Sequence, residues 1–254
     1  MKLLCIGNSF SQDACAYMDK IAAAGNFDLT TVNLFIGGCS LERHASNIGV
    51  FDKDHRYTKY VNSVSMGYIS LEEALTEDTY DIVSVQQASP HSGVWETYQP
   101  YIEEVVDYVR KHQPGAKIAI HETWAYEADL RLNFLKEKYE GSRHVMHERL
   151  SECYRRAEKL IGADLFIPSG DVIKALRDIP AFDPEMYGAR LTSDGGHLSK
   201  SYGRYAAGLT WCAALGMENI MENTFVPPFV DIRRDLINII KETVVKTVIS
   251  GDEK

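Results

Sequence analysis

Two short stretches, far apart in the chain, carry residue types that can act together as a nucleophile and its base. Near the N-terminus, GNSFS (Gly7 to Ser11) places Ser9 directly behind an apolar run. Much later, TSDGGHLS places Asp194 and His197 three positions apart across two glycines. A serine hydroxyl becomes a nucleophile when a histidine takes its proton and a carboxylate orients that histidine. These residue types therefore predict a Ser–His–Asp triad.

Each stretch also has a purely structural explanation. Serines commonly cap a helix that follows a strand, which would account for Ser9, and Asp-x-x-His can form a helix-capping turn. However, Ser9 follows the strand-like run Lys2–Ile6 and precedes a helix-like run. Sites in open parallel sheets form at this end of the strands, and the helix N-terminus favours developing negative charge. The position of Ser9 therefore suits a nucleophile.

The elements that must position these residues alternate between short apolar runs and longer amphipathic ones. Five short runs rich in valine and isoleucine predict strands buried on both faces: Lys2–Ile6, Thr31–Ile36, Asp81–Val85, Lys117–His121 and Asp164–Ile167. Apolar residues recur at helical spacing in Val145–Gly162. This βαβα order predicts an α/β fold in which helices cover both faces of a parallel sheet.

Local signals place several helix ends. Ser70 to Glu73 has the form of a capping box, and Gly25 and Gly162 stand where glycines end helices. Helices over Lys200–Leu215 and Asp231–Ile249 are expected to close the fold. No internal repeat or low-complexity linker interrupts the sequence, so we expect a single domain over residues 1–254.

Composition narrows the partners and the location. The chain has 254 residues, of which 45% are hydrophobic, and a formal net charge of −9, which argues against nucleic acid as a partner. No apolar run approaches the ~20 residues that span a bilayer, so we expect no membrane insertion and a cytoplasmic location, or secretion if a signal peptide has been removed. The cysteines are odd in number, widely spaced and without CxxC, and we interpret most of them as core residues: Cys5, Cys15, Cys39, Cys153 and Cys212.

The motifs together resemble the SGNH, or GDSL-like, hydrolase superfamily, with GNSFS as block I and DGGH as block V. The chain most resembles the bacterial DUF4886 subfamily, through GNSFSQDA, IGGCSLERH, QQASPHSG, HETWAY, IPSG and DGGHLSKSYGRY. The resemblance implies a three-layer, flavodoxin-like αβα sandwich of about five parallel strands. It also implies hydrolysis of acyl esters without a cofactor, commonly removal of acetyl groups from carbohydrates.

The resemblance also implies an oxyanion hole. Its block II glycine matches Gly38, with Gly37 as the alternative. Block III ordinarily carries an asparagine whose amide donates a hydrogen bond, but this sequence has glutamines instead. A glutamine amide offers the same donor on a longer arm, so we expect Gln86 or Gln87 to take this role, with Gln86 favoured.

Other polar clusters are expected to be less central. In HETWAY, His121, Trp124 and Tyr126 lie at or just after the end of a predicted strand, so they are candidates for stacking on a sugar, although packing in the core would explain them equally well. His144, His147 and Glu148 match neither HExxH nor HxxEH, so we expect no metal site.

Two functions are compatible with this sequence. The first is a cofactor-free serine esterase that removes acetyl or other short acyl groups from a small-molecule or oligosaccharide ester. The second is a noncatalytic carbohydrate-binding protein whose altered block III has ended hydrolysis. Retention of Ser9, Asp194 and His197 favours the enzyme.

Overall fold

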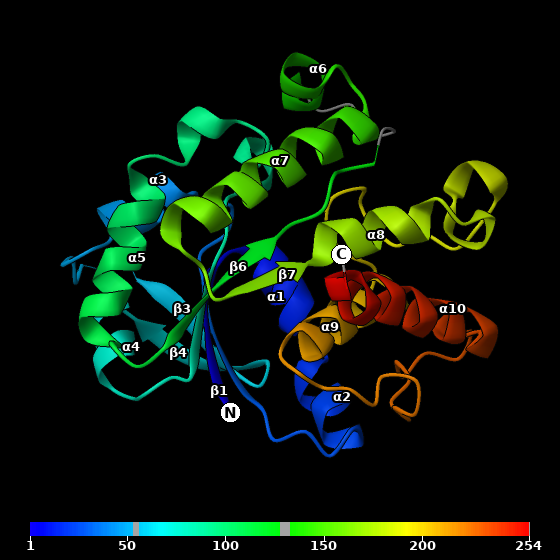
Figure 1. Cartoon of the computed structure of the whole chain (residues 1–254), viewed down its shortest axis with the longest axis horizontal. Coiled ribbons are helices and arrows are strands. Elements are labelled where there is room, and N and C mark those ends of the chain that lie inside the picture. The colour runs from blue at the N-terminus through cyan, green and yellow to red at the C-terminus, as the bar shows by residue number, and fades with distance from the viewer. Residues whose placement is uncertain (53–55, 128–132, 254) are drawn as a thin grey trace.

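A mixed seven-stranded sheet with helices on both faces organises the molecule (Figure 1). The computed structural model describes residues 1–52, 56–127 and 133–253. The strands are β1 Lys2–Gly7, β2 Thr30–Phe35, β3 Tyr57–Val61, β4 Val64–Ile69, β5 Ile82–Val85, β6 Lys117–Glu122 and β7 Leu165–Pro168. The helices are α1 Ser9–Cys15, α2 Met18–Ala24, α3 Leu41–Ser46, α4 Leu71–Thr76, α5 Tyr101–His112, α6 Asn133–Tyr139, α7 Arg143–Ile161, α8 Ser169–Arg177, α9 Gly203–Ala214 and α10 Arg234–Val244.

The strand order, β4-β3-β2-β1-β5-β6-β7, puts β1 at the centre of the sheet. The five predicted strands are all present and run parallel to one another, in the order β2-β1-β5-β6-β7. After β1 the chain moves outward on one side through β2, and it later returns to the other side of β1 as β5. Such a switch in strand order opens a crevice at the carboxyl ends of the strands, which is where Ser9 lies.

The hairpin β3–β4 is an addition that the sequence did not predict. It pairs antiparallel with β2 and extends that edge of the sheet. Its two-residue turn has positive φ at Asn62 (46°) and Ser63 (65°), the backbone of a tight type I′ turn.

Successive side chains of β1 pack alternately into two hydrophobic cores, one on each face of the sheet. Leu3 and Cys5 pack on one face of the sheet with α1, α2, α8, α9 and α10, while Leu4 and Ile6 pack on the other with α4, α5 and α7. Figure 1 shows the same division, with α4, α5 and α7 on one side and α1, α2, α9 and α10 on the other. The sheet is therefore the middle layer of an αβα sandwich, as predicted.

Helix ends follow the local signals in the sequence. Ser70 and Glu73 form the reciprocal capping box at the start of α4, and Gly162 ends α7 in the left-handed conformation. The predicted C-terminal helix is divided into α10 and a π-helical turn over Val245–Ile249. Within the described ranges, no helix combines the length and apolar character that crossing a bilayer requires.

Candidate active site

Ser9 is the first residue of α1, and only Asn8 separates it from the end of the central strand β1. Asn8 caps this helix: its backbone is extended (φ −139°), and its side-chain oxygen accepts a hydrogen bond from the Phe10 N–H at 3.0 Å. The first N–H groups of a helix have no acceptor within the helix. The Ser9 hydroxyl is therefore presented beside the backbone N–H groups of the first turn and at the positive end of the helix dipole.

The fold brings Ser9, His197 and Asp194 together in one chain of hydrogen bonds. His197 Nε2 lies 3.0 Å from Ser9 Oγ, and His197 Nδ1 lies 2.7 Å from Asp194 Oδ2. When the imidazole is neutral, Nδ1–H donates to the carboxylate and leaves Nε2 as the acceptor for the serine proton. The geometry therefore suits His197 as a base and Asp194 as the group that fixes its tautomer.

The loop around Asp194 holds its carboxylate in place. The other oxygen, Oδ1, accepts hydrogen bonds from the backbone N–H groups of Gly196 (3.0 Å) and His197 (2.7 Å). Desolvation acts to raise the pKa of Asp194, but the His197 ring and these N–H groups outweigh it and hold the pKa below its ordinary value. Gly195 has φ +84°, a conformation that glycine adopts without the penalty of a Cβ.

Asp13, one helical turn after Ser9, anchors the loop that carries His197. Its Oδ2 accepts a hydrogen bond from Leu198 N–H at 2.7 Å, and its Oδ1 pairs with Arg204 at 2.8 Å. Desolvation raises the pKa of this buried carboxyl, and the Arg204 charge partly offsets the rise. One short helix therefore positions both the hydroxyl of Ser9 and the loop of its partner histidine.

A cavity of about 390 Å³ opens over the Ser9 hydroxyl. Its described lining residues are Asn8, Ser9, Phe10, Gly37, Gly38, Ala88, Ser89, Pro90, His91, Tyr126 and His197. Both candidate block II glycines therefore reach the cavity. Gly38 has φ +63°, so the sharp turn after β2 requires a residue that tolerates the left-handed region.

The side chain of Gln86 is not in this cavity, which corrects the prediction that it donates directly to the substrate. Its Nε2 donates to Asn8 Oδ1 at 2.9 Å, and its Oε1 lies 2.7 Å from His121 Nδ1. His121 Nε2 in turn lies 3.1 Å from Ser169 Oγ, and Asn8 Nδ2 donates to the Cys39 carbonyl at 3.0 Å. Burial lowers the pKa of His121 to about 3, so the ring is neutral. The network therefore ties the turn before Ser9 to the loop after β2.

Gln87 is committed to the fold as well, so the same correction applies to it. Its oxygen accepts hydrogen bonds from the N–H groups of Leu41 (3.0 Å) and Ala88 (2.8 Å). Its amide nitrogen donates to the carbonyl (2.9 Å) and the hydroxyl (3.1 Å) of Thr97. These four contacts use its full hydrogen-bonding capacity.

Of the three predicted substrate-stacking residues, only Tyr126 lines the cavity. His121 and Trp124 are fully buried, so their predicted contact with substrate is corrected. Trp124 stacks on Phe10 at 4.2 Å and donates its indole N–H to the Gly196 carbonyl at 2.8 Å. It therefore holds the loop between Asp194 and His197 through the Gly196 carbonyl.

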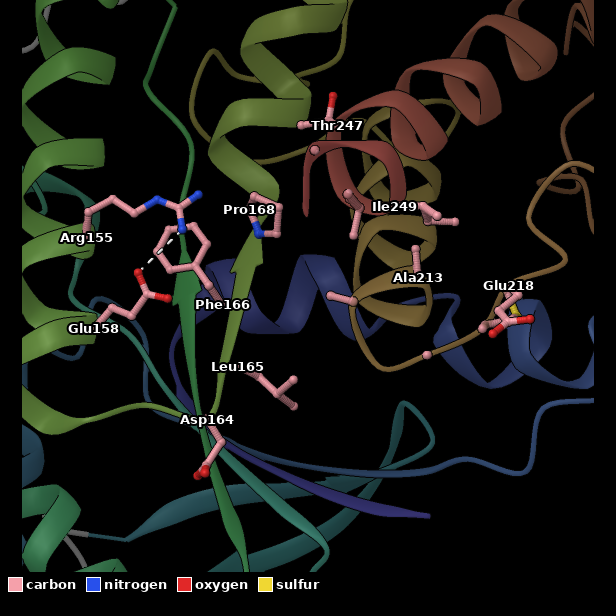
Figure 2. Close-up of a pocket in the computed structure, with 15 residues that line it drawn as sticks. Arg155, Glu158, Asp164, Leu165, Phe166, Pro168, Ala213, Glu218, Thr247 and Ile249 are labelled. Carbon is pink, nitrogen blue, oxygen red and sulfur yellow. Dashed lines mark hydrogen bonds and ion pairs between the residues drawn. The ribbon is translucent and has the colours of Figure 1, made fainter. Parts of the chain in front are cut away.

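A second cavity, about 530 Å³ in volume, lies at the β7 edge of the sheet near the C-terminus. Figure 2 shows the Arg155 guanidinium stacked over the Phe166 ring and paired with Glu158. Its described lining includes no serine, cysteine or histidine. A hydroxyl and a histidine therefore meet at the Ser9 cavity, whereas the described lining of this second cavity offers the Thr247 hydroxyl without a histidine beside it. Nowhere in the described ranges do three histidine, cysteine or carboxylate side chains gather as a metal site.

Sequence reasoning missed Asp13 and Asn8. The spacing of Asp13 from Ser9, four residues along a helix, was a usable signal because such residues share a face. The partners of Asp13 lie 185 and more residues away along the chain, so they could not be identified before the fold was known.

Comparisons with known proteins agree with this architecture. No curated protein matches the chain. A crystal structure of a DUF4886 family protein from Bacteroides uniformis superposes with a TM-score of 0.87, is 31% identical, and the match covers 99% of this chain and 96% of that one. Two further structures share the fold. One is a candidate SGNH hydrolase from Slackia heliotrinireducens, with a TM-score of 0.57 and 22% identity over 85% of this chain and 99% of that one. The other is a candidate GDSL-like lipase from Parabacteroides merdae, with a TM-score of 0.58 and 14% identity over 85% of this chain and 96% of that one. The family model described as "Domain of unknown function (DUF4886)" matches residues 2–244, so the chain belongs to the DUF4886 family.

Proposed function

We propose that this protein is a serine ester hydrolase that uses Ser9, His197 and Asp194. One observation carries the proposal: the hydrogen-bonded chain from Asp194 through His197 to Ser9 ends at a cavity wide enough for a small acyl group. The fold shared with SGNH hydrolases agrees with this function without identifying the reaction.

The proposed reaction proceeds in two halves. Ser9 Oγ attacks the ester carbonyl while His197 Nε2 takes the serine proton, and the backbone N–H groups of Ser9 and Gly38 stabilise the resulting oxyanion. The tetrahedral intermediate then collapses, and His197 returns the proton to the departing alkoxide. In the second half a water molecule attacks the acyl-enzyme with the same base, which releases the acid and restores Ser9.

The proposed substrate is a carbohydrate carrying acetyl or other short acyl groups. Phe10, Pro90 and Tyr126 give the Ser9 cavity an apolar wall that suits a small acyl chain. A smaller cavity of about 170 Å³ shares His91 with it, and its lining also contains Glu42, Glu96 and Tyr101. Carboxylates and phenols can accept hydrogen bonds from sugar hydroxyls, so this neighbouring space suits the alcohol portion of the ester.

Acetate release tests the proposal. The protein is incubated with acetylated oligosaccharides and with a generic acetyl ester, and Ser9→Ala is compared with wild type. Ser11→Ala is a control in the same helix because Ser11 does not line the cavity; its hydroxyl lies 2.8 Å from the Asn33 side-chain oxygen and 2.9 Å from the Asn8 carbonyl.

We expect Ser9→Ala to abolish release and Ser11→Ala to retain it. Binding of the acetylated sugar without Ser9-dependent release would instead support the noncatalytic carbohydrate-binding alternative.

A further inference from the structure

The structure leaves the oxyanion site without the side-chain donor that the sequence predicted. Gln86 and Gln87 both turn into the fold, as described above. Only the backbone N–H groups of Ser9 and Gly38 then remain from the expected set. A third preorganised donor is worth looking for, because removing one donor from such a site costs about 2.7–4 kcal/mol of transition-state stabilisation.

Ser89 is the candidate for this donor. It follows the carboxyl end of β5, the strand beside β1, and begins the 3₁₀ turn Ser89–His91. It lines the same cavity as Ser9 and Gly38. Ser89 therefore reaches the crevice from the strand that carries block III, three residues beyond Gln86.

The hydroxyl of Ser89 is buried and makes no hydrogen bond. The residue is only 4% exposed, and its Oγ has no hydrogen-bond partner. Most buried polar groups in proteins are hydrogen-bonded. A buried polar group without a partner lowers the free energy of unfolding by about 1–3 kcal/mol. Ser89 lines the candidate active site although its Oγ points away from solvent, and a hydroxyl that lacks a partner there is explained if it turns toward the substrate when one is bound.

Tyr126 is a competing partner for this hydroxyl. Burial raises the pKa of the Tyr126 phenol to about 12, and the Ser89 hydroxyl moderates the rise, so the two groups are neighbours. They do not meet in an ordinary hydrogen bond, since Ser89 Oγ lacks any partner. A serine hydroxyl can turn between staggered positions about χ1, so it is able to follow a charge that develops in the cavity.

We propose that Ser89 Oγ donates the third hydrogen bond to the oxyanion, in place of the block III asparagine. This inference rests on the proposed esterase function. When the bond from Ser9 Oγ to the carbonyl carbon forms, the carbonyl π pair moves onto oxygen, and the Ser89 O–H donates a hydrogen bond to that oxygen without giving up its proton. The bond weakens again when the carbonyl re-forms and the alkoxide leaves with the proton from His197.

Ser89→Ala tests the inference through kinetics and stability together. We expect kcat for ester hydrolysis to fall by about 10²-fold, with little change in KM because the interaction forms in the transition state. Thermal unfolding should occur at an unchanged or higher temperature, since the substitution removes an unsatisfied buried hydroxyl. A merely structural serine would instead lower the unfolding temperature.

Ser92→Ala is the matched control. Ser92 is fully buried in the same turn and donates its hydroxyl to the Ser89 carbonyl at 2.9 Å, but it does not line the cavity. If loss of activity came from a loosened turn, this variant would lose kcat as well; we expect it to lose stability while keeping kcat near wild type.

The outcomes separate this inference from the proposed function. Ser9-dependent hydrolysis in wild type, with unchanged kcat in Ser89→Ala, would overturn the role of Ser89 and leave the esterase standing. Equal loss of kcat in Ser89→Ala and Tyr126→Phe, with no further loss in the double variant, would show that Ser89 acts only through Tyr126 and would also overturn it. Absence of Ser9-dependent hydrolysis would remove both proposals.

Discussion

At the scale of single residues, the two oxygens of Asp194 have different hydrogen-bond partners, so a substitution at this position is a sensitive test of the proposed triad. Oδ1 accepts two backbone N–H groups, whereas Oδ2 faces His197 Nδ1. In Asp194→Asn, the amide oxygen can keep the backbone bonds, so the NH₂ group then faces the ring. Because two donors cannot pair, His197 is driven to the tautomer that carries its proton on Nε2, toward Ser9.

That tautomer cannot accept the serine proton, so we expect kcat to fall by up to about 10⁴-fold. Steady-state kinetics measures the loss, and circular dichroism checks that the variant is folded. A variant that kept wild-type kcat would contradict the assignment of His197 as the base.

Residue types and order made the contact between Ser9, His197 and Asp194 predictable, but they did not determine the direction of neighbouring side chains. The position of a residue at the end of a strand determines where its backbone lies. It does not determine whether the side chain points into the cavity or into the interior of the protein. Gln86 and Trp124 were both assigned to the cavity for this reason, and both find better hydrogen-bond partners inside. A buried amide or indole that is left unpaired costs about 1–3 kcal/mol of folding free energy, so both side chains pair within the fold.

At the scale of elements, α1 couples the two halves of the site, because Ser9 starts the helix and Asp13 lies one turn later. Asp13→Ala removes the acceptor of Leu198 N–H and the partner of Arg204. We expect the free energy of unfolding to fall by about 1.5–3 kcal/mol, as for hydrogen bonds to charged groups. We also expect kcat to fall, since the loop that carries His197 loses its anchor.

Urea unfolding and steady-state kinetics measure these two losses. Asp13→Asn is the matched comparison: the amide keeps an acceptor for Leu198 N–H but not the charge that pairs with Arg204. It should therefore recover more of kcat than of stability. An Asp13→Ala variant with wild-type kcat would show that the loop holds His197 without help from α1.

The sequence predicted the five parallel strands because each is a short run of mostly apolar residues. The hairpin β3–β4 was not predicted because a strand at the edge of a sheet need not be apolar. Most of β4 is exposed, and its residues mix polar and apolar types. The two positive-φ residues of its turn, Asn62 and Ser63, form a weaker signal than the Asn-Gly pair that typically marks such turns.

At the scale of the whole molecule, one sheet serves two cores, and the free cysteines are distributed between them. Cys5, Cys15 and Cys212 lie in the core beside α1 and α9, whereas Cys153 lies in the opposite core. All five cysteines, Cys39 included, are buried and unpaired with one another in disulfides. Burial also raises the pKa of Cys39 to about 12 and that of Cys153 to about 11. Since the thiolate is the reactive form, native thiols should react very slowly.

The single-domain prediction can be tested with these thiols. If both cores unfold together, a thiol reagent added along a urea series should label all five cysteines in one transition that coincides with the loss of helical circular dichroism. Cys153→Ala, which removes the cysteine of the α7 side, identifies the contribution of that core. Labelling of Cys153 at a lower urea concentration than Cys5, Cys15 and Cys212 would show that the two faces of the sheet unfold separately. We expect a single transition, because β1 contributes Leu3 and Cys5 to one core and Leu4 and Ile6 to the other, so that neither core can lose this strand without exposing its partner.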